Sequence, residues 1–202
     1  MLILYVHGFL SSPLSHKAQQ TSNYCQQQTP GVRFSCPALP AYPEQAMSIL
    51  VNLIEQNLIE QNADQKIGLI GSSLGGYYAT CLSERYRLPT VLVNPAVKPY
   101  TLMANYLDQD LANYHTDEVS RLSAKDVQQL REIEVDSLQC PDNYWLMVQT
   151  GDETLDYTLA VKRYQSCKMT IEEGGDHGFQ NFDRWLPDIF SFLSSRFTTG
   201  NK

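Results

Sequence analysis

One glycine-rich run constrains the fold of this chain more than any other feature: Gly71-Ser72-Ser73-Leu74-Gly75-Gly76. It follows an apolar run at 67–70 that is typical of a buried strand, and it precedes a helix-like segment at 77–82. A serine at such a junction stands on a sharp turn that holds its hydroxyl clear of the backbone. The run therefore predicts a nucleophile elbow, with Ser73 as the candidate nucleophile.

The spacing of the glycines has a steric cause. In so tight a turn the strand and the helix crowd together, and a residue two positions before or after the serine has almost no space for a side chain. Gly71 and Gly75 meet that demand around Ser73, whereas a turn centred on Ser72 would put an isoleucine and a leucine there. The alternative is an ordinary glycine-rich turn without chemistry, because a short motif is a hypothesis until its context supports it.

Short apolar segments alternate with helical patterns along the rest of the chain, which predicts a parallel sheet with helices on both faces. Right-handed crossovers and an analogy with α/β-hydrolases give the order 2-1-3-4-5-6 for its six strands. The expected strands lie at 2–6, 32–36, 66–70, 89–93, 144–149 and 168–171. The expected helices begin at Pro13 with Ser12 as cap, run over 44–62 and over 74–86, and begin again at Phe182 with a kink or restart at Pro187.

We expect a single α/β domain over residues 1–202, with an insertion at about 96–140. This connection is far longer than α/β units need, so it predicts a small helical cap over the carboxyl edge of the sheet. It holds eight acidic and four basic side chains, which would disfavour polyanionic substrates. The alternative is a solvated surface insertion without a role in selectivity. Its aromatic residues Tyr100, Tyr106 and Tyr114 either line an acyl pocket or pack inside the insertion.

The composition excludes several classes of function. The net charge of −7 and the lack of a basic stripe argue against a nucleic-acid partner. The five cysteines are odd in number and lack Cys-x-x-Cys spacing, so we interpret them as reduced, buried thiols of a cytoplasmic protein. The longest apolar runs fall well short of a membrane span. The histidines have no metal-ligand spacing, and the sequence indicates neither a metal nor a cofactor.

A catalytic serine needs a base within hydrogen-bond reach and a carboxylate behind that base. Among the four histidines, His177 lies in the loop after the last expected strand, where flanking glycines let the loop reach across the site. His177 also fits the chain order serine, acid, histidine that is typical of this motif class. The alternative is a loop histidine without a role.

The acid is expected in the loop after the fifth strand, where Asp152, Glu153 and Asp156 compete. Asp152 sits directly at the end of the strand, on the side where the elbow emerges, so we assign it as the acid. Glu153 and Asp156 are then charges at a helix start or residues facing solvent.

The oxyanion that forms when Ser73 attacks a carbonyl needs fixed N–H donors. The backbone N–H of Leu74 is well placed at the start of the elbow helix. The second donor belongs in the loop after the first strand, where we assign Phe9, with Leu10 as the alternative. We expect His7, in the same loop, to be a buried residue that braces the loop.

Six groups of residues carry a family resemblance. They are His7-Gly8-Phe9 with Ser11-Ser12-Pro13, Leu39-Pro40 with Tyr42-Pro43, 71–80, Val93-Asn94-Pro95-Ala96-Val97, 149–153 with 155–157, and Glu173-Gly174-Gly175 with His177. Together they resemble the bacterial YqiA esterase family, over nearly the whole chain and least at about 101–139. The resemblance implies a compact α/β-hydrolase with activity on acyl esters and, as an open alternative, on acyl thioesters, and by position it points to Ser73, Asp152 and His177 as the triad.

The leading hypothesis is a serine carboxylesterase that hydrolyses small-molecule acyl esters through an acyl-enzyme intermediate. The nearest alternative is an acyl thioesterase of the acyl-CoA type with the same triad, against which the acidic insertion argues. A catalytically silent binding protein with the same fold is the alternative from another class. A nucleotide-binding protein is disfavoured, because the glycine run lacks the P-loop lysine and the Gly-x-Gly-x-x-Gly spacing.

Overall fold

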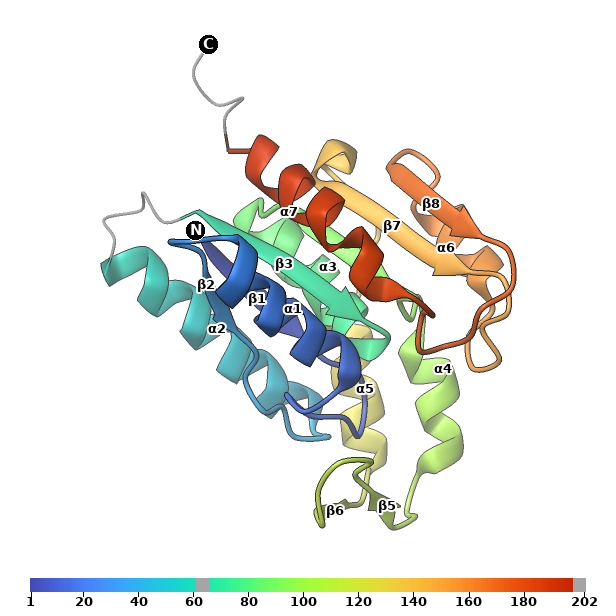
Figure 1. The fold of residues 1–202 in the computed structure, drawn as a ribbon. Helices are drawn as coiled ribbons and strands as arrows, with labels where there is room; N and C mark the ends of the chain where they lie inside the picture. Colours follow the sequence, from blue (N-terminus) through green and yellow to red (C-terminus); the bar gives the residue numbers. More distant parts are fainter. Residues whose placement is uncertain (61–65, 198–202) are drawn as a thin grey trace.

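A six-stranded parallel sheet forms the middle layer of the molecule (Figure 1). The computed structural model describes residues 1–60 and 66–197. The strands follow the order β2-β1-β3-β4-β7-β8, which confirms the predicted order and fold class. They are β1 (Leu2–Val6), β2 (Arg33–Ser35), β3 (Ile67–Ser72), β4 (Thr90–Val93), β7 (Tyr144–Gln149) and β8 (Lys168–Glu172).

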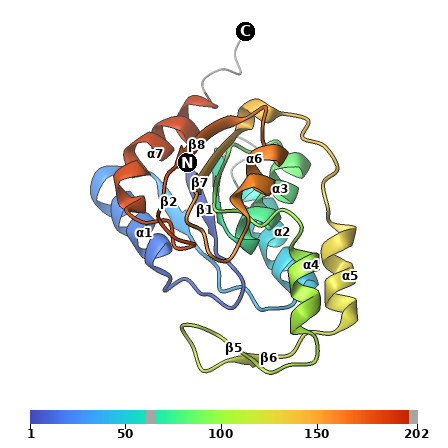
Figure 2. The ribbon, with the colours of Figure 1, turned by 90° about the vertical axis from the view of Figure 1, so that its right-hand side faces the viewer.

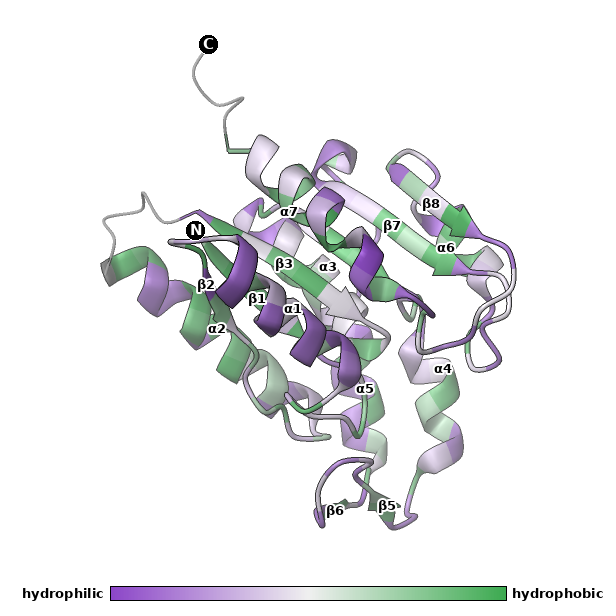
Figure 3. Ribbon diagram, in the orientation of Figure 1, coloured by the Kyte–Doolittle hydropathy of each residue, from purple (hydrophilic) through white to green (hydrophobic). Residues whose placement is uncertain are grey.

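Helices cover both faces of the sheet (Figure 2). One face carries α1 (His16–Gln28) and α7 (Leu186–Ser195), and the other carries α2 (Pro43–Glu60), α3 (Leu74–Tyr86) and α6 (Tyr157–Arg163). Because side chains alternate along a strand, β1 sends Leu4 into the core under α2 and α3, and it sends Ile3 and Tyr5 into the core under α1 and α7. The central strands are therefore apolar on both sides, and the green stretches of β3 and β7 in Figure 3 mark their most hydrophobic residues.

The start of the first helix was predicted wrongly. Helix α1 begins at His16, not at Pro13, and its N-cap is Ser15. The Ser12 hydroxyl accepts a hydrogen bond from the Leu14 N–H, and the Ser12 carbonyl accepts one from the Ser15 N–H. These local bonds form a turn that competes with a helical start, so the chain enters the helix three residues later than predicted.

The other boundaries agree with the structure within a few residues. Pro187 restarts the last helix, since a 3-10 turn (η3, Phe182–Trp185) leads into α7 with Pro187 in its first turn. The predicted end of the second helix at 61–62 lies outside the described residues. All five cysteines are free thiols, of which Cys25 is buried and the other four are half-buried rather than buried. In the part of the chain that the structure describes, no helix has both the length and the apolar character to cross a membrane.

The insertion extends from the carboxyl end of the sheet, below α3 in Figure 1. It contains the expected helices, α4 (Pro99–Met103) with a 3-10 turn (η1, Ala104–Tyr106), and α5 (Ala124–Glu132). Between them lies an antiparallel pair that the sequence did not predict, β5 (Leu111–Ala112) and β6 (Val119–Ser120). A further 3-10 turn (η2, Pro141–Asn143) leads back into β7. Strands of two residues are too short to show a period-two pattern, so the sequence gives no signal for β5 and β6.

Candidate active site

Ser73 stands on a strained turn between β3 and α3. Its backbone has φ 55° and ψ −124°, in the left-handed half of the map that a serine rarely adopts. A Cβ added to Gly75 would lie 2.0 Å from the Val6 carbonyl oxygen, and one added to Gly71 would lie 2.6 Å from the Gly75 carbonyl oxygen. Both glycines are therefore required by contact with backbone, as the elbow prediction assumed, and the strain is of the kind found at functional sites.

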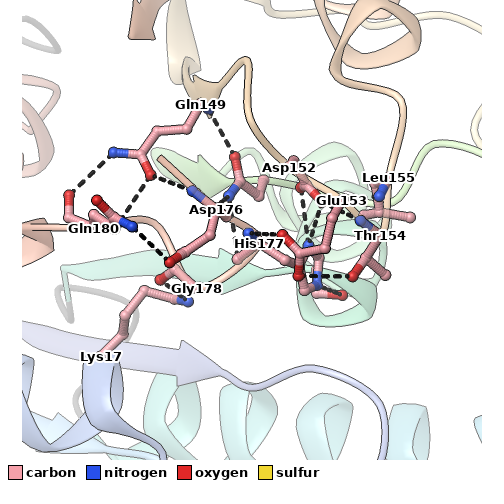
Figure 4. Close-up of polar contacts among 12 residues, drawn as sticks. Lys17, Gln149, Asp152, Glu153, Thr154, Leu155, Asp176, His177, Gly178 and Gln180 are labelled. Atoms are coloured by element: carbon pink, nitrogen blue, oxygen red, sulfur yellow. Dashed lines mark hydrogen bonds and ion pairs between the residues drawn. The ribbon is translucent and has the colours of Figure 1, made fainter. Parts of the chain in front are cut away.

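The structure brings Ser73, His177 and Asp152 into one line of hydrogen bonds at the carboxyl edge of the sheet. The Ser73 Oγ atom lies 3.0 Å from His177 Nε2. On the other side of the ring, His177 Nδ1 lies 2.9 Å from Asp152 Oδ2 and 3.0 Å from Asp152 Oδ1, as Figure 4 shows. Three residues far apart in the sequence thus meet with the spacing that a nucleophile, a base and an orienting acid require.

Asp152 is held as a buried carboxylate. Its side chain is 1% exposed, and its Oδ1 atom accepts hydrogen bonds from the N–H groups of Thr154 and Leu155 at 2.9 and 2.8 Å. Burial alone raises the pKa of Asp152, but the hydrogen bonds from His177, Leu155 and Thr154 outweigh it and hold the pKa below its ordinary value. The carboxylate is therefore charged at neutral pH and fixes the proton of the imidazole on Nδ1.

The two competing carboxylates of this loop have other contacts. Asp156 is the N-cap of α6 and accepts hydrogen bonds from the N–H and the hydroxyl of Thr158. Glu153 accepts a hydrogen bond from the backbone N–H of His177 at 3.0 Å. Asp156 thus has the helix-start position expected of it, whereas Glu153 fastens the loop that carries the histidine, a contact that the sequence did not indicate.

Two buried polar residues at strand ends hold the His177 loop, and sequence reasoning missed both roles. Asn94, just after β4, donates from Nδ2 to the carbonyl oxygens of Asp176 and His177. Gln149, at the end of β7, accepts from the N–H groups of Asp176 and Gln180 through Oε1 (Figure 4). The available signal was an amide side chain at the end of an apolar strand, where a buried polar group needs partners.

The predicted oxyanion donors lie beside Ser73. Phe9, Leu10 and Leu74 all line the cavity that contains the Ser73 hydroxyl. Leu74 is the first residue of α3, so its N–H has no partner within the helix. Gly8 allows the loop after β1 to approach closely, because a Cβ there would lie 3.1 Å from the Ser73 Cβ. Leu10 has a positive φ of 52° and turns the loop back toward α1.

His7 braces this loop, as expected. It is buried, its Nε2 atom accepts the Leu39 N–H at 3.0 Å, and its Nδ1–H donates to the Gly8 carbonyl at 2.9 Å. The Leu39 N–H can only donate, so the proton of the neutral ring must be on Nδ1. Burial lowers the pKa of His7, although its bond to Gly8 acts in the opposite direction. Because a trans peptide points its N–H opposite to its C=O, this contact also fixes the direction of the Phe9 N–H.

A cavity of about 370 Å³ opens over Ser73 and His177. The insertion supplies one apolar side of it with Leu102, Met103 and Tyr106, and Tyr114 of the β5–β6 connection adds to the rim. Tyr100, in contrast, is buried and donates a hydrogen bond to Glu134. Of the three tyrosines considered from the sequence, two therefore lie on the pocket and one packs inside the insertion. Lys17 also lines the pocket, and the sequence gave no reason to place it there.

The insertion is connected to the loop that carries the oxyanion donors. The Tyr114 N–H donates to the Leu10 carbonyl at 2.8 Å, and the Asn113 side chain donates to the Ser11 carbonyl at 3.0 Å. No group of three or more potential metal ligands occurs among the described residues. The site thus combines a serine in contact with a histidine, a charged carboxylate behind that histidine, two candidate backbone donors and a largely apolar pocket, an arrangement that could support acyl transfer.

Solved structures of low sequence identity share this fold. Est1E from Butyrivibrio proteoclasticus has a TM-score of 0.74 and 14% identity, and the similarity covers 98% of this chain and 88% of that protein. Alpha/beta hydrolase domain-containing protein 10 from mouse has a TM-score of 0.71 and 14% identity, with 96% and 90% covered. These similarities show the α/β-hydrolase fold.

Sequence comparison identifies the family. The protein YcfP of Salmonella paratyphi A is 24% identical over 193 residues, which are 95% of this chain and 98% of that protein. It is described as a UPF0227 protein, and the model of that family matches residues 2–194 of this chain. The YqiA name itself stays a prediction. The chain therefore belongs to UPF0227, described as an uncharacterised protein family, and has the α/β-hydrolase fold.

Proposed function

We propose that this protein is a serine carboxylesterase. The observation that carries the proposal is the continuous contact from the Ser73 hydroxyl through both nitrogens of His177 to a buried, charged Asp152. A strained elbow, two candidate oxyanion donors and an adjoining apolar pocket support it. The α/β-hydrolase fold that this chain shares with the solved structures is compatible with this chemistry but does not define a substrate.

In the proposed reaction Ser73 Oγ attacks the carbonyl carbon of an ester while His177 Nε2 takes the hydroxyl proton. The N–H groups of Phe9 and Leu74 stabilise the oxyanion of the tetrahedral intermediate, each by about 3 kcal/mol. His177 then returns the proton to the leaving alkoxide oxygen, and the carbon–oxygen bond breaks to give the alcohol and an acyl-Ser73. A water molecule, deprotonated by His177, releases the acid and restores Ser73.

The test compares hydrolysis of 4-nitrophenyl acetate by the wild-type protein and by Ser73→Ala. We expect the variant to lose turnover by roughly 10⁴-fold or more, because nucleophile and base act as a unit. Ser48→Ala, on the exposed surface of α2, is the matched control and should keep wild-type turnover. Equal turnover by Ser73→Ala and wild type would exclude the proposed mechanism.

A further inference from the structure

One end of the pocket is cationic. Lys17, in the first turn of α1, lines the pocket together with Ser73 and His177. Its Nζ atom donates to the Gly178 carbonyl at 2.7 Å, next to the candidate base (Figure 4). Lys17 takes part in none of the ion pairs found among the described residues. Burial lowers the pKa of this half-buried amine to about 8, although Asp176 and Asp152 act in the opposite direction at longer range.

The Ser15 hydroxyl is a second polar group at this end of the pocket. Ser15 is the N-cap of α1, but its hydroxyl makes no cap hydrogen bond. The Ser15 Oγ atom is buried and lacks any hydrogen-bond partner in the part of the chain that the structure describes. Ser15 also lines the pocket. Since a buried hydroxyl without a partner is costly, a ligand atom that bonds to it would remove that cost.

The helix itself adds to the positive potential. The 13-residue helix α1 has no acidic side chain in its own first turn, so no carboxylate of the helix itself offsets the positive end of its dipole. No aspartate or glutamate is among the described residues that line the pocket. A lysine, a hydroxyl and a helix N-terminus therefore meet at one end of the pocket. Among residues 1–60 and 66–197, none pairs with that hydroxyl and no acidic side chain lines the pocket.

We propose that this end binds a carboxylate carried by the substrate. One lysine and one hydroxyl match a single negative charge, whereas the net charge of −7 would repel a polyanion. The inference rests on the proposed esterase function and adds the substrate class to it: esters that are neutral at the reacting carbonyl and anionic elsewhere.

The geometry assigns the carboxylate to the alcohol half of the ester. His177 Nε2 must deliver its proton to the leaving oxygen, so the leaving half lies beside the histidine. Lys17 is hydrogen-bonded to the residue that follows His177. Helix α4, which supplies Leu102 and Met103 to the apolar side of the pocket, lies apart from α1 in Figures 1 and 2. The acyl half therefore faces the apolar wall, and the leaving alcohol carries the negative charge toward Lys17.

The test uses two acetate esters that differ only in this charge, 3-acetoxybenzoate and 3-acetoxybenzamide. Each kcat/KM is first divided by the rate constant for hydroxide hydrolysis of the same ester, which corrects for intrinsic reactivity. The corrected value for 3-acetoxybenzoate is then divided by that for 3-acetoxybenzamide, so that a general loss of activity cancels in the ratio. We expect the wild type to favour the carboxylate about tenfold or more, and Lys17→Met to bring the ratio to within about twofold of unity. Ser15→Ala should reduce the ratio as well, and Lys162→Met, which changes an exposed lysine of α6, should leave it unchanged.

Three outcomes overturn the inference. A wild-type ratio near unity, with Ser73-dependent hydrolysis of both esters, would refute the anion site and leave the proposed function intact. A ratio that survives in Lys17→Met would show that another group binds the carboxylate. A preference for the monophenyl ester of adipate over the phenyl ester of adipamic acid, which places the charge on the acyl half, would contradict the assignment to the leaving alcohol. If the wild type hydrolyses neither acetate ester, the proposed esterase function is refuted, and the inference that rests on it is refuted as well.

Discussion

Burial and hydrogen bonding decide which acid pairs with the histidine. The sequence places three carboxylates after the fifth strand and favours Asp152 by its position at the strand end, but spacing alone cannot show which side chain turns inward. Asp152 is the buried one and contacts both His177 Nδ1 and two backbone N–H groups. Asp156 caps α6 instead.

Asp152→Asn tests the pairing of Asp152 with His177, because it replaces one carboxylate oxygen by an amide nitrogen. If the new amide nitrogen faces His177 Nδ1, the ring proton must move to Nε2, which can then no longer accept the Ser73 proton. We expect kcat for 4-nitrophenyl acetate to fall by roughly 10³- to 10⁴-fold. Asp156→Asn keeps a good helix cap and should retain wild-type kcat. A kcat within about tenfold of wild type for Asp152→Asn would assign the orienting role to another residue.

His7 should make stability depend on pH near neutrality. Its pKa in the folded protein is lowered from 6.5 by burial, so the unfolded chain binds a proton more readily than the folded one. The contribution of His7 to stability is therefore present above pH 6.5 and is lost as the pH falls through the lower, folded pKa.

Urea unfolding between pH 5 and 8 measures this effect. We expect the free energy of unfolding of the wild type to decrease below pH 6.5 with a slope of up to about 1.4 kcal/mol per pH unit, and His7→Gln to show a smaller slope. Identical slopes in the two proteins would mean that His7 is protonated as readily in the folded as in the unfolded state.

At the scale of elements, the junction of β3 and α3 depends on backbone contact. A Cβ at Gly75 would overlap the carbonyl of Val6, which belongs to a central strand and cannot move freely. We expect Gly75→Ala to lower the free energy of unfolding by about 3 kcal/mol in urea denaturation. At Gly178 a Cβ would meet only the Asp176 side chain, so Gly178→Ala should cost less than about 1 kcal/mol. Equal losses of unfolding free energy in Gly75→Ala and Gly178→Ala would show that the elbow can hold a side chain at Gly75.

The ends of β4 and β7 hold the His177 loop through amide side chains. Asn94 accepts the Gln149 N–H through Oδ1 and donates to two carbonyls of the loop through Nδ2. Asn94→Ala leaves these buried groups without partners, so we expect a loss of about 1–3 kcal/mol in unfolding free energy and a lower kcat. Asn94→Asp replaces the donor by an acceptor that faces two carbonyl oxygens, and it should be at least as unstable. A fully stable aspartate variant would contradict this network.

At the scale of the whole molecule, local patterns were enough for the sheet and for three residues of the site. Apolar runs predicted the strands, glycine spacing predicted the elbow at Ser73, and the position of each loop after its strand predicted the loops that carry Asp152 and His177. The strand order also required right-handed crossovers and the analogy with α/β-hydrolases. The start of α1 and the β5–β6 pair were missed, because a local turn at Ser12 and two-residue strands leave no periodic signal.

Several of the contacts at the site that the sequence did not indicate join segments far apart in the chain. Lys17 reaches the pocket only because the start of α1 packs beside the loop after β8, 161 positions later. Asn113 likewise donates a hydrogen bond to the Ser11 carbonyl, although the two residues are 102 positions apart. Such contacts depend on the packing of complete elements, which no short window of sequence contains.

Covalent labelling identifies the nucleophile at this edge of the sheet without any choice of substrate. The protein is treated with a fluorophosphonate, digested, and the modified peptide is identified by mass spectrometry. If Ser73 is the nucleophile, it is the one phosphonylated residue, with labelling abolished in Ser73→Ala and strongly slowed in His177→Ala. An adduct on a different serine, or unmodified Ser73 in a preparation that hydrolyses esters, would show that Ser73 is not the nucleophile.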